Sequence, residues 1–410
     1  MKQDFHFDLL ITHCALATMA GTRYGKMENA ALGVLDGKIA WIGLMAGLDP
    51  EATAERTIDA AGKWLLPGFV DCHTHLIWGG SRSDEFEMRL QGATYEEIAK
   101  KGGGIFSTVS ATRAASEDQL FEAASKRVSH LLEQGVTCLE IKSGYGLDLE
   151  TEFKMLAVAG RLNRAFPQEI TATFLSAHAL PPEFKDRSGR YIDLVVNTML
   201  PAIKEQGIAR AVDVFCERIA FSRDETEQVF QKALDLGFDI KLHAEQLSDS
   251  DGAALAAGMG ALSCDHLEYL SRQGARAMAQ SGTVAVLLPG AFYYLKETQL
   301  PPIKWFRELD IPMAVSTDLN PGSSPVHAMT QVMNMSCLLF GLTCEEALAG
   351  ATLNGARALG LADRKGSLEK GKDADLALWD IDSPADLCYL SGYTPLELVV
   401  TGGQIAYTRS

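Results

Sequence analysis

Residues 65–75 read Leu65-Leu66-Pro67-Gly68-Phe69-Val70-Asp71-Cys72-His73-Thr74-His75, an apolar run that ends in one aspartate and two histidines. In an extended strand, successive side chains point to opposite faces, so Asp71, His73 and His75 share one face. Two imidazoles on one side of a strand can bind the same metal ion. The stretch therefore predicts a buried strand with a metal-ligating end.

Short apolar runs alternate with amphipathic segments between about residues 64 and 358. The apolar runs predict eight buried parallel strands, at 65–73, 136–142, 170–178, 211–217, 239–244, 261–266, 283–289 and 312–318. The segments between them predict helices, including 115–134, 149–165, 188–206, 223–236 and 325–340. Eight strand–helix units are typical of a (β/α)8 TIM barrel, an α/β fold. A doubly wound open sheet is the alternative.

Five of the predicted strands end in residues suited to catalysis, which favours the barrel over the open sheet. These residues are the pair His73 and His75, then His178, His243, His266 and Asp318. In a barrel, the carboxyl ends of all strands converge on one rim, where the active sites of this fold lie. The remaining histidines (His6, His13, His130 and His327) have no such position, and we expect them to be ordinary surface or core residues.

The two ends of the chain predict strands broken by glycine turns. The predicted pieces are 8–17, 31–42 and 56–59 at one end, and 375–380, 396–401 and 404–408 at the other. Neither end has enough apolar residues for a core of its own. We expect residues 1–63 and 364–410 to form one small β-sandwich domain beside a barrel at 64–363.

The formal net charge is −16 and the isoelectric point is near 5.0. An acidic surface repels nucleic acid and anionic membranes, so we expect neither as a partner. The eight cysteines are scattered and form no Cys-x-x-Cys pair, which indicates a reduced, cytoplasmic protein. For the assembly, a homodimer is the default expectation for a soluble enzyme.

Four of the strand-end residues make a metal-ligand set: His73, His75, His243 and Asp318. They come from three distant segments that meet only if the barrel closes. Imidazole and carboxylate ligands suit zinc and iron equally, so the sequence leaves the metal open between the two. A catalytic metal ion of this kind lowers the pKa of a bound water from about 15.7 to about 7.

These residues resemble the amidohydrolase superfamily, in which Asp71-x-His73-x-His75 is followed by histidines on strands 5 and 6 and an aspartate on strand 8. The resemblance implies a barrel with a small β domain built from both termini. Many members hold two metals bridged by a carboxylated lysine on strand 4, but residues 211–217 contain no lysine. We therefore expect one ion per subunit, and a structural or charge-balancing role for Lys142.

Four further segments are similar to the imidazolonepropionase family: Ile141–Leu147, Ser176–Ala179, Lys241–Glu245 and Ser316–Ser323, together with Phe86–Tyr95. That family hydrolyses the cyclic amide 4-imidazolone-5-propanoate to N-formimidoyl-L-glutamate in histidine degradation, with a metal-activated water. The resemblance thus implies a hydrolase acting on carbon–nitrogen bonds.

The resemblance also implies roles for single residues. Those expected to bind substrate are Arg82, Tyr145, His178, Asn320, Gly322 and Ser323. His266 is expected to stabilise the oxyanion, and Asp318 to transfer the proton of the water while it ligates the metal. Some family members carry glutamate where this chain has Gln246; because an amide cannot move a proton, we expect Gln246 to orient the substrate. Without the resemblance, Arg82 fits a surface arginine equally well and Tyr145 a core aromatic.

Three alternatives remain at this point. Another mononuclear amidohydrolase, such as a nucleobase deaminase or a formimidoylglutamate deiminase, shares the metal ligands but releases ammonia. A barrel that has lost catalysis is disfavoured by the intact ligand set. A protein that only binds an acidic metabolite shows a thermal shift without turnover.

Overall fold

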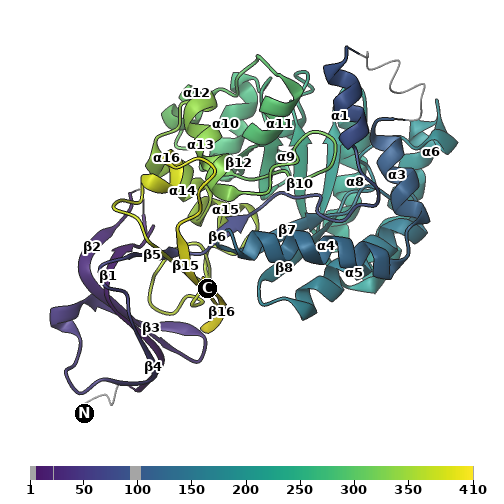
Figure 1. Cartoon of the computed structure of the whole chain (residues 1–410). Helices are drawn as coiled ribbons and strands as arrows, with labels where there is room; N and C mark the ends of the chain where they lie inside the picture. The colour runs from purple at the N-terminus through teal and green to yellow at the C-terminus, as the bar shows by residue number, and fades with distance from the viewer. Residues whose placement is uncertain (1–5, 22, 93–102, 410) are drawn as a thin grey trace.

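A computed structural model describes residues 6–21, 23–92 and 103–409, and it contains two sheets (Figure 1). The barrel sheet consists of eight parallel strands in chain order: β6 (Phe69–Asp71), β7 (Val136–Lys142), β8 (Glu169–Phe174), β9 (Ala209–Cys216), β10 (Asp239–Ala244), β11 (Ser263–His266), β12 (Val284–Leu287) and β13 (Met313–Val315). A parallel bridge between Thr74 and Leu319 joins the chain just after β6 to the chain just after β13. The predicted TIM barrel is therefore confirmed.

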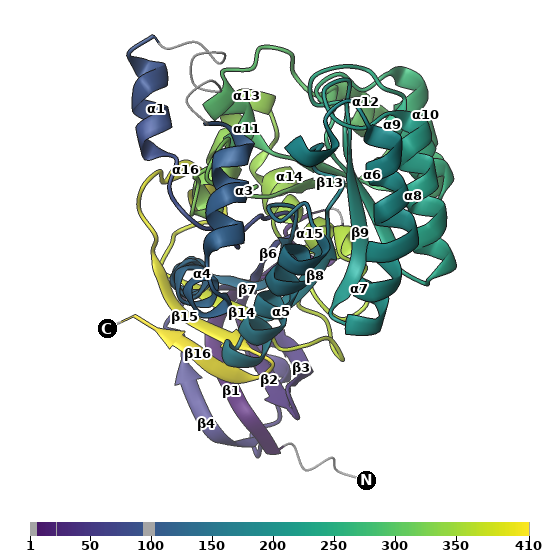
Figure 2. The same ribbon diagram turned by 90° about the vertical axis from the view of Figure 1, so that its right-hand side faces the viewer.

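Helices cover the outside of the barrel strands (Figure 2). They are α3 (Ile105–Ala114), α4 (Glu117–Leu132), α5 (Leu149–Ala165), α6 (Ser188–Leu194), α7 (Leu200–Gln206), α8 (Arg223–Asp235), α9 (Gly252–Gly258), α10 (Arg272–Ser281), α11 (Pro289–Leu295), α12 (Ile303–Glu308), α13 (Met329–Phe340), α14 (Cys344–Gly350) and α15 (Leu353–Ala358). In α4, Leu120, Ala124, Val128 and Leu131 are buried at helical spacing. Ser116 and Gln119 cap this helix reciprocally, which explains where it begins.

The segment predicted as one helix at 188–206 is interrupted. A π-helical turn at Val195–Met199 separates α6 from α7. Pro201 lies at the beginning of α7, where its missing N–H removes one backbone donor from the helical ladder.

The small domain combines both ends of the chain, as predicted. Its strands are β1 (His6–Ala17), β2 (Lys26–Leu35), β3 (Lys38–Leu44), β4 (Thr53–Asp59), β5 (Trp64–Pro67), β14 (Leu376–Trp379), β15 (Leu396–Thr401) and β16 (Gln404–Thr408). The order in the sheet is β16-β15-β14-β5-β1-β2-β3, with β4 paired to β1. The antiparallel pair β5–β14 joins the two halves. This sheet has its own apolar core, which includes Ile11, Leu32 and Val400.

The strand predicted over 65–73 is wrong in its first part. The chain breaks at Gly68, so residues 64–67 pair with β14 in the small domain and only 69–71 enter the barrel. Gly68 donates its N–H to Asp375 O at 3.0 Å, and a Cβ there would lie 2.3 Å from the Thr137 side chain. One apolar run thus serves two sheets, because only glycine fits at the crossing.

The long segment after β6 contains α1 (Ser83–Leu90), which extends beyond the barrel helices (Figure 2). Residues 93–95, the end of the matched segment Phe86–Tyr95, lie outside the described residues. One short helix, α16 (Asp386–Tyr389), connects β14 to β15. Among the described residues, the structure contains no helix of the length and apolarity needed to span a bilayer.

Candidate metal centre

The four predicted metal ligands meet at the carboxyl ends of the barrel strands. Asp318 Oδ1 lies 3.5 Å from Nε2 of both His73 and His75. His243 Nε2 lies 3.3 Å from His75 Nε2. All four side chains are buried. Three distant segments therefore bring three imidazoles and one carboxylate to a common point.

Unpaired nitrogen atoms show that this set fits a metal ion. His73 donates its Nδ1–H to Asp265 Oδ2 at 2.5 Å, which leaves Nε2 as the atom with the lone pair. That buried Nε2 has no hydrogen-bond partner. The facing Nε2 atoms of His75 and His243 also need a cation or a proton between them. Burial is the main cause that lowers the pKa of His73 and His75 well below the usual range, so both rings are neutral, as ligation requires.

Two carboxylates that the sequence did not single out lie behind the ligands: Asp213 on β9 and Asp265 on β11. Asp265 orients His73, as described above, and accepts a hydrogen bond from Ser263 Oγ at 2.6 Å. Asp213 accepts from the backbone N–H of His243 at 3.1 Å, and its other oxygen lies 3.0 Å from His243 Nδ1. Such carboxylates fix the ring orientation of ligating histidines and raise their basicity. Charged residues inside apolar strands were the available signal, because buried charges need partners.

Lys142 neutralises these carboxylates, in agreement with the predicted charge-balancing role. Its Nζ lies 2.7 Å from Asp213, 2.9 Å from Glu140 and 3.7 Å from Asp265. These acids raise the pKa of the Lys142 ammonium above its usual value, against the opposing effect of burial. Lys142 is therefore a buried cation beneath the ligand set.

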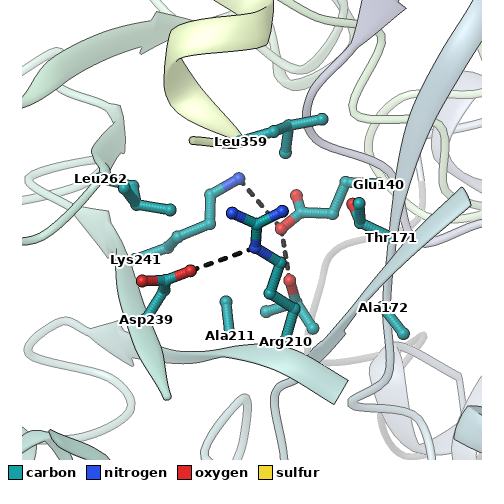
Figure 3. A pocket seen from close by; sticks show the side chains of 10 residues that line it. Glu140, Thr171, Ala172, Arg210, Ala211, Asp239, Lys241, Leu262 and Leu359 are labelled. Atoms are coloured by element: carbon teal, nitrogen blue, oxygen red, sulfur yellow. Dashed lines mark hydrogen bonds and ion pairs between the residues drawn. The ribbon is translucent and has the colours of Figure 1, made fainter. Parts of the chain in front are cut away.

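The network continues to the opposite end of the barrel (Figure 3). There Lys241 Nζ lies 2.9 Å from Glu140 and donates to Cys72 O at 2.8 Å. Figure 3 shows the Lys241 and Glu140 side chains pointing toward each other, with Arg210 paired to Asp239 nearby. The cavity between them measures only about 10 Å³, room for about one water molecule. The residues around this cavity are therefore structural, whereas the candidate metal ligands lie at the carboxyl ends of the strands.

Strand alternation groups Asp71 with the two histidines, but its carboxylate bonds instead to the residues that follow β13, the last barrel strand. Its carboxylate accepts hydrogen bonds from Thr317 N at 3.0 Å and Thr317 Oγ1 at 2.7 Å, and another from Ser316 Oγ. Asp318 follows with a φ of +50°, which is rare for a residue other than glycine. Asp71 thus holds the backbone that aims Asp318. Burial raises the pKa of Asp318 well above its usual range, whereas the hydrogen bond from Asn320 and the ammonium of Lys142 act in the opposite direction.

Tyr145 and His178 form a wall beside the ligands. The His178 ring stacks on His75, with centroids 5.1 Å apart and planes inclined by 16°. Tyr145 lies 5.8 Å from His75 and 5.6 Å from His178, centroid to centroid. Gly144, with a φ of +103°, accepts a hydrogen bond from His178 Nδ1 at 3.0 Å through its carbonyl oxygen. Both predicted binding residues therefore lie beside the candidate metal centre.

On another side, the loop after β13 is folded by Asn320. The Asn320 side chain accepts from the backbone N–H groups of Gly322 and Ser323 at 2.8 and 2.7 Å, and donates to Asp318 O at 2.7 Å. Arg82 lies against this loop, since a Cβ on Gly322 would be 3.0 Å from Arg82 Nη1. Its guanidinium forms two hydrogen bonds to Glu85 and a longer one, 3.4 Å, to Thr108 Oγ1. The structure thus places Arg82 beside Gly322, in the loop that Asn320 folds.

His266 lies beside the ligands and also satisfies the geometry of one. Its ring is 5.5 Å from His243 and 5.9 Å from His73, centroid to centroid. The candidate ligand atoms of these three histidines lie within 4.8 Å of one another. His266 has a φ of +82° and a buried Nδ1 without a hydrogen-bond partner. Its ring is therefore held at the site by strained backbone and is free to bond to something else.

Gln246 and Glu245 differ in their surroundings. Glu245 is buried and accepts from the N–H groups of Gly252 and Ala253, at 2.7 and 3.1 Å, at the beginning of α9. Gln246 is half-buried. The adjacent carboxylate of Glu245 is thus engaged by a helix terminus.

Comparison with known proteins finds a family and relatives that match most of the chain. The model of the amidohydrolase family matches residues 64–406. Imidazolonepropionase of Cupriavidus necator is 57% identical over 379 residues, covering 92% of this chain and 91% of that protein. The enzymes of the same name from Ralstonia nicotianae and Shewanella baltica are 54% and 52% identical, with coverage of at least 96% on both sides.

Solved structures support the fold. An adenosine deaminase from Xanthomonas campestris with bound zinc superimposes with a TM-score of 0.71 at 19% identity, covering 98% of this chain and 93% of that one. A triazine hydrolase from Arthobacter aurescens gives a TM-score of 0.74 at 19% identity, covering 97% and 94%. At such identities these structures establish the architecture alone.

Proposed function

Because the chain belongs to the amidohydrolase family, and within it to the imidazolonepropionases, it is a hydrolase that opens the ring of 4-imidazolone-5-propanoate in histidine degradation, and we propose how its residues divide that work. The observation that carries the proposal is the convergence of three imidazoles and Asp318 on one point of the barrel rim.

We propose that His73, His75, His243 and Asp318 hold one ion of zinc or iron. When bound, the ion supplies a Lewis acid and a water of lowered pKa. The absence of lysine from β9 supports a single ion, since many members of the superfamily bridge a second ion with a lysine there. Asp265 and Asp213, which lie against Nδ1 of His73 and His243, keep these rings in the orientation that ligation needs.

Proton transfer is assigned to Asp318, and stabilisation of the oxyanion to His266. Asp318 is an acceptor at the centre of the ligand set, so it can take the proton of the attacking water and return it to the departing ring nitrogen. His266, whose ring lies beside His243 and His73, can donate a hydrogen bond to the oxygen that gains charge. Both residues have left-handed backbone, which supports a functional reason for the strain.

Substrate recognition is assigned to the residues around that centre. Arg82 can grip the propanoate with two parallel hydrogen bonds, and its present partner Glu85 shows that it bonds to carboxylate in this way. Tyr145 and His178 present aromatic faces to a flat ring. The loop of Asn320, Gly322 and Ser323 closes the opposite side, and Gln246 orients the ring through its amide.

We further propose that the enzyme works in the cytoplasm, as a homodimer, without nucleic-acid or membrane partners. All eight cysteines are free, which supports a reducing compartment. The charge of −16 supports the absence of polyanionic partners.

Turnover of fresh 4-imidazolone-5-propanoate tests the activity. The loss of ultraviolet absorbance, formimidoylglutamate and ammonia are measured together, with a chelator-treated sample as the control for spontaneous decay. Metal-dependent formimidoylglutamate without ammonia is expected. Release of ammonia would instead indicate a deaminase or deiminase that shares the ligands.

Gln246→Glu tests the assignment of the orienting amide. The substitution replaces a donor by a carboxylate, so turnover falls at least about threefold if the amide donates to the ring. Gln231→Glu, on the exposed side of α8, is the matched control and keeps wild-type turnover. Loss of less than threefold in Gln246→Glu would contradict the assignment.

A further inference from the structure

Three cysteines form a cluster that shares no residue with the ligand set described above. The Sγ atoms of Cys337, Cys344 and Cys388 lie within 4.8 Å of one another, and all three thiols are free. They come from three helices: the last turn of α13, the beginning of α14, and α16. Figure 1 shows these helices side by side near the small domain. Since the three residues are separated in sequence, only the tertiary structure brings the sulfur atoms together.

Hydrogen bonds fix the position of each helix. Asn334 of α13 donates from Nδ2 to Cys388 O at 2.7 Å, which attaches α16 to α13. Cys388 Sγ in turn donates to Cys344 O at 3.8 Å. A few residues on, Ser391 Oγ donates to Gln331 Oε1 at 2.7 Å. These hydrogen bonds between the helices thus hold the three sulfur atoms in place.

The surroundings of the cluster suit a cation. Cys388 is buried, whereas Cys337 and Cys344 are half-buried, so an ion can enter from one side. Glu345 lies next in the chain to Cys344, and its carboxylate accepts from the backbone N–H of Tyr24 at 3.2 Å. The three sulfur atoms therefore lie where an ion can reach them from the half-buried side.

We propose that Cys337, Cys344 and Cys388 form a second metal site, which binds one soft cation such as Zn²⁺ through three thiolates. Thiolate is a preferred ligand of Zn²⁺, and Zn–S bonds of about 2.3 Å separate two sulfur atoms by about 3.8 Å in a tetrahedron. Sulfur atoms within 4.8 Å of one another reach that geometry by small side-chain rotations. Binding releases the thiol protons to solvent and involves no oxidation.

The site would connect the two parts of the fold. Cys388 lies in the segment between β14 and β15 of the small domain, while Cys337 and Cys344 belong to helices of the barrel. A bound ion therefore stabilises the contact between them. No residue is shared with the catalytic set, so occupancy raises the midpoint temperature of unfolding without being needed for turnover.

Cd²⁺ is the probe, because its bonds to thiolate give an ultraviolet charge-transfer band. The enzyme carrying its catalytic metal is kept reduced with a phosphine, passed through a desalting column and titrated with Cd²⁺. The catalytic ligand set contains no sulfur, so the band reports the cysteine site. We expect the band to saturate at one ion per chain, and added Zn²⁺ to compete for it and to raise the unfolding midpoint.

Cys337→Ser is the test variant, since this half-buried side chain tolerates the change better than the buried Cys388 does. It weakens Cd²⁺ binding at least about tenfold and abolishes the Zn²⁺-dependent rise in midpoint, with turnover retained. Cys14→Ser, at a single buried thiol whose Sγ donates to Ala30 O at 3.3 Å, is the matched control and keeps the band. Absence of the band in the wild type, or an equal band in Cys337→Ser, would overturn the proposal.

Discussion

Asp265→Asn isolates the contribution of the carboxylate behind His73 to metal binding. Asp265 is fully buried, accepts from His73 Nδ1 at 2.5 Å and from Ser263 Oγ at 2.6 Å, and does not itself face the ligand centre. Asparagine has nearly the same shape. Its Oδ1 can accept from His73, while its amide can donate to Ser263 Oγ. The substitution therefore removes the charge and retains both contacts.

The expected magnitude follows from the kind of hydrogen bond. A bond to a charged group contributes about 1.5–3 kcal/mol and a neutral one about 0.5–1.5 kcal/mol. The difference of about 1–1.5 kcal/mol corresponds to a metal affinity about tenfold weaker. This value lies within the loss of about 10–100-fold that is typical when partners of ligating histidines are changed.

Competition with a chromophoric chelator measures the affinity, and metal retained after dialysis is measured by mass spectrometry. Asp239→Asn is the matched control: it is the same change, at the other end of the barrel, in a carboxylate 3.2 Å from Arg210. An Asp265→Asn protein that binds metal within about twofold of the wild type would refute the assignment of Asp265 as the group that orients His73.

Three further predictions concern recognition and stability. Arg82→Lys keeps the charge but loses the forked donor pair, so steady-state kinetics will show KM about tenfold higher with kcat little changed. An unchanged KM would contradict the assignment of Arg82 to substrate binding. Gly144→Ala places a Cβ 2.8 Å from the backbone oxygen of Leu175 and 3.0 Å from His178 Nδ1, so the chain that positions His178 shifts and KM rises. Gly371→Ala, which also has a positive φ but no neighbour within 4 Å, keeps KM. Burial, helped by His130 and Arg127, lowers the pKa of His327 below 6.5, so the folded state favours the neutral ring. The free energy of unfolding is therefore fully retained above pH 6.5 and decreases as the pH falls below that value. Urea unfolding at several pH values will show a smaller loss in His327→Gln, and equal losses in both proteins would contradict this origin.

The barrel was predictable because its signals are local. The apolar runs at 136–142 and 239–244 coincide with β7 and β10, and the helix at 149–165 coincides with α5. Ligands at strand ends followed from the same pattern, since parallel strands place their carboxyl ends on one rim. Each of these inferences needs only the spacing of residues within one segment.

Features that depend on contacts across the fold were not predictable in the same way. The break at Gly68 is decided by Thr137 on the neighbouring strand and by Asp375 far along the chain. The pairing of Asp265 with His73 crosses the barrel, as does that of Lys241 with Glu140. Sequence showed that these buried charges need partners, but the partners themselves are set by the register of the closed sheet.

The balance of buried charge supports one ion at the catalytic centre. Glu140, Asp213 and Asp265 face the ammonium groups of Lys142 and Lys241 in one connected network, which leaves one negative charge. Asp318 adds a second. A single divalent cation balances these two charges, while the carboxylate of Asp71 is stabilised separately by hydrogen bonds from Ser316 and Thr317. Lys142 therefore supplies, as a fixed ammonium beneath the ligands, positive charge that a second ion brings in other members of the superfamily.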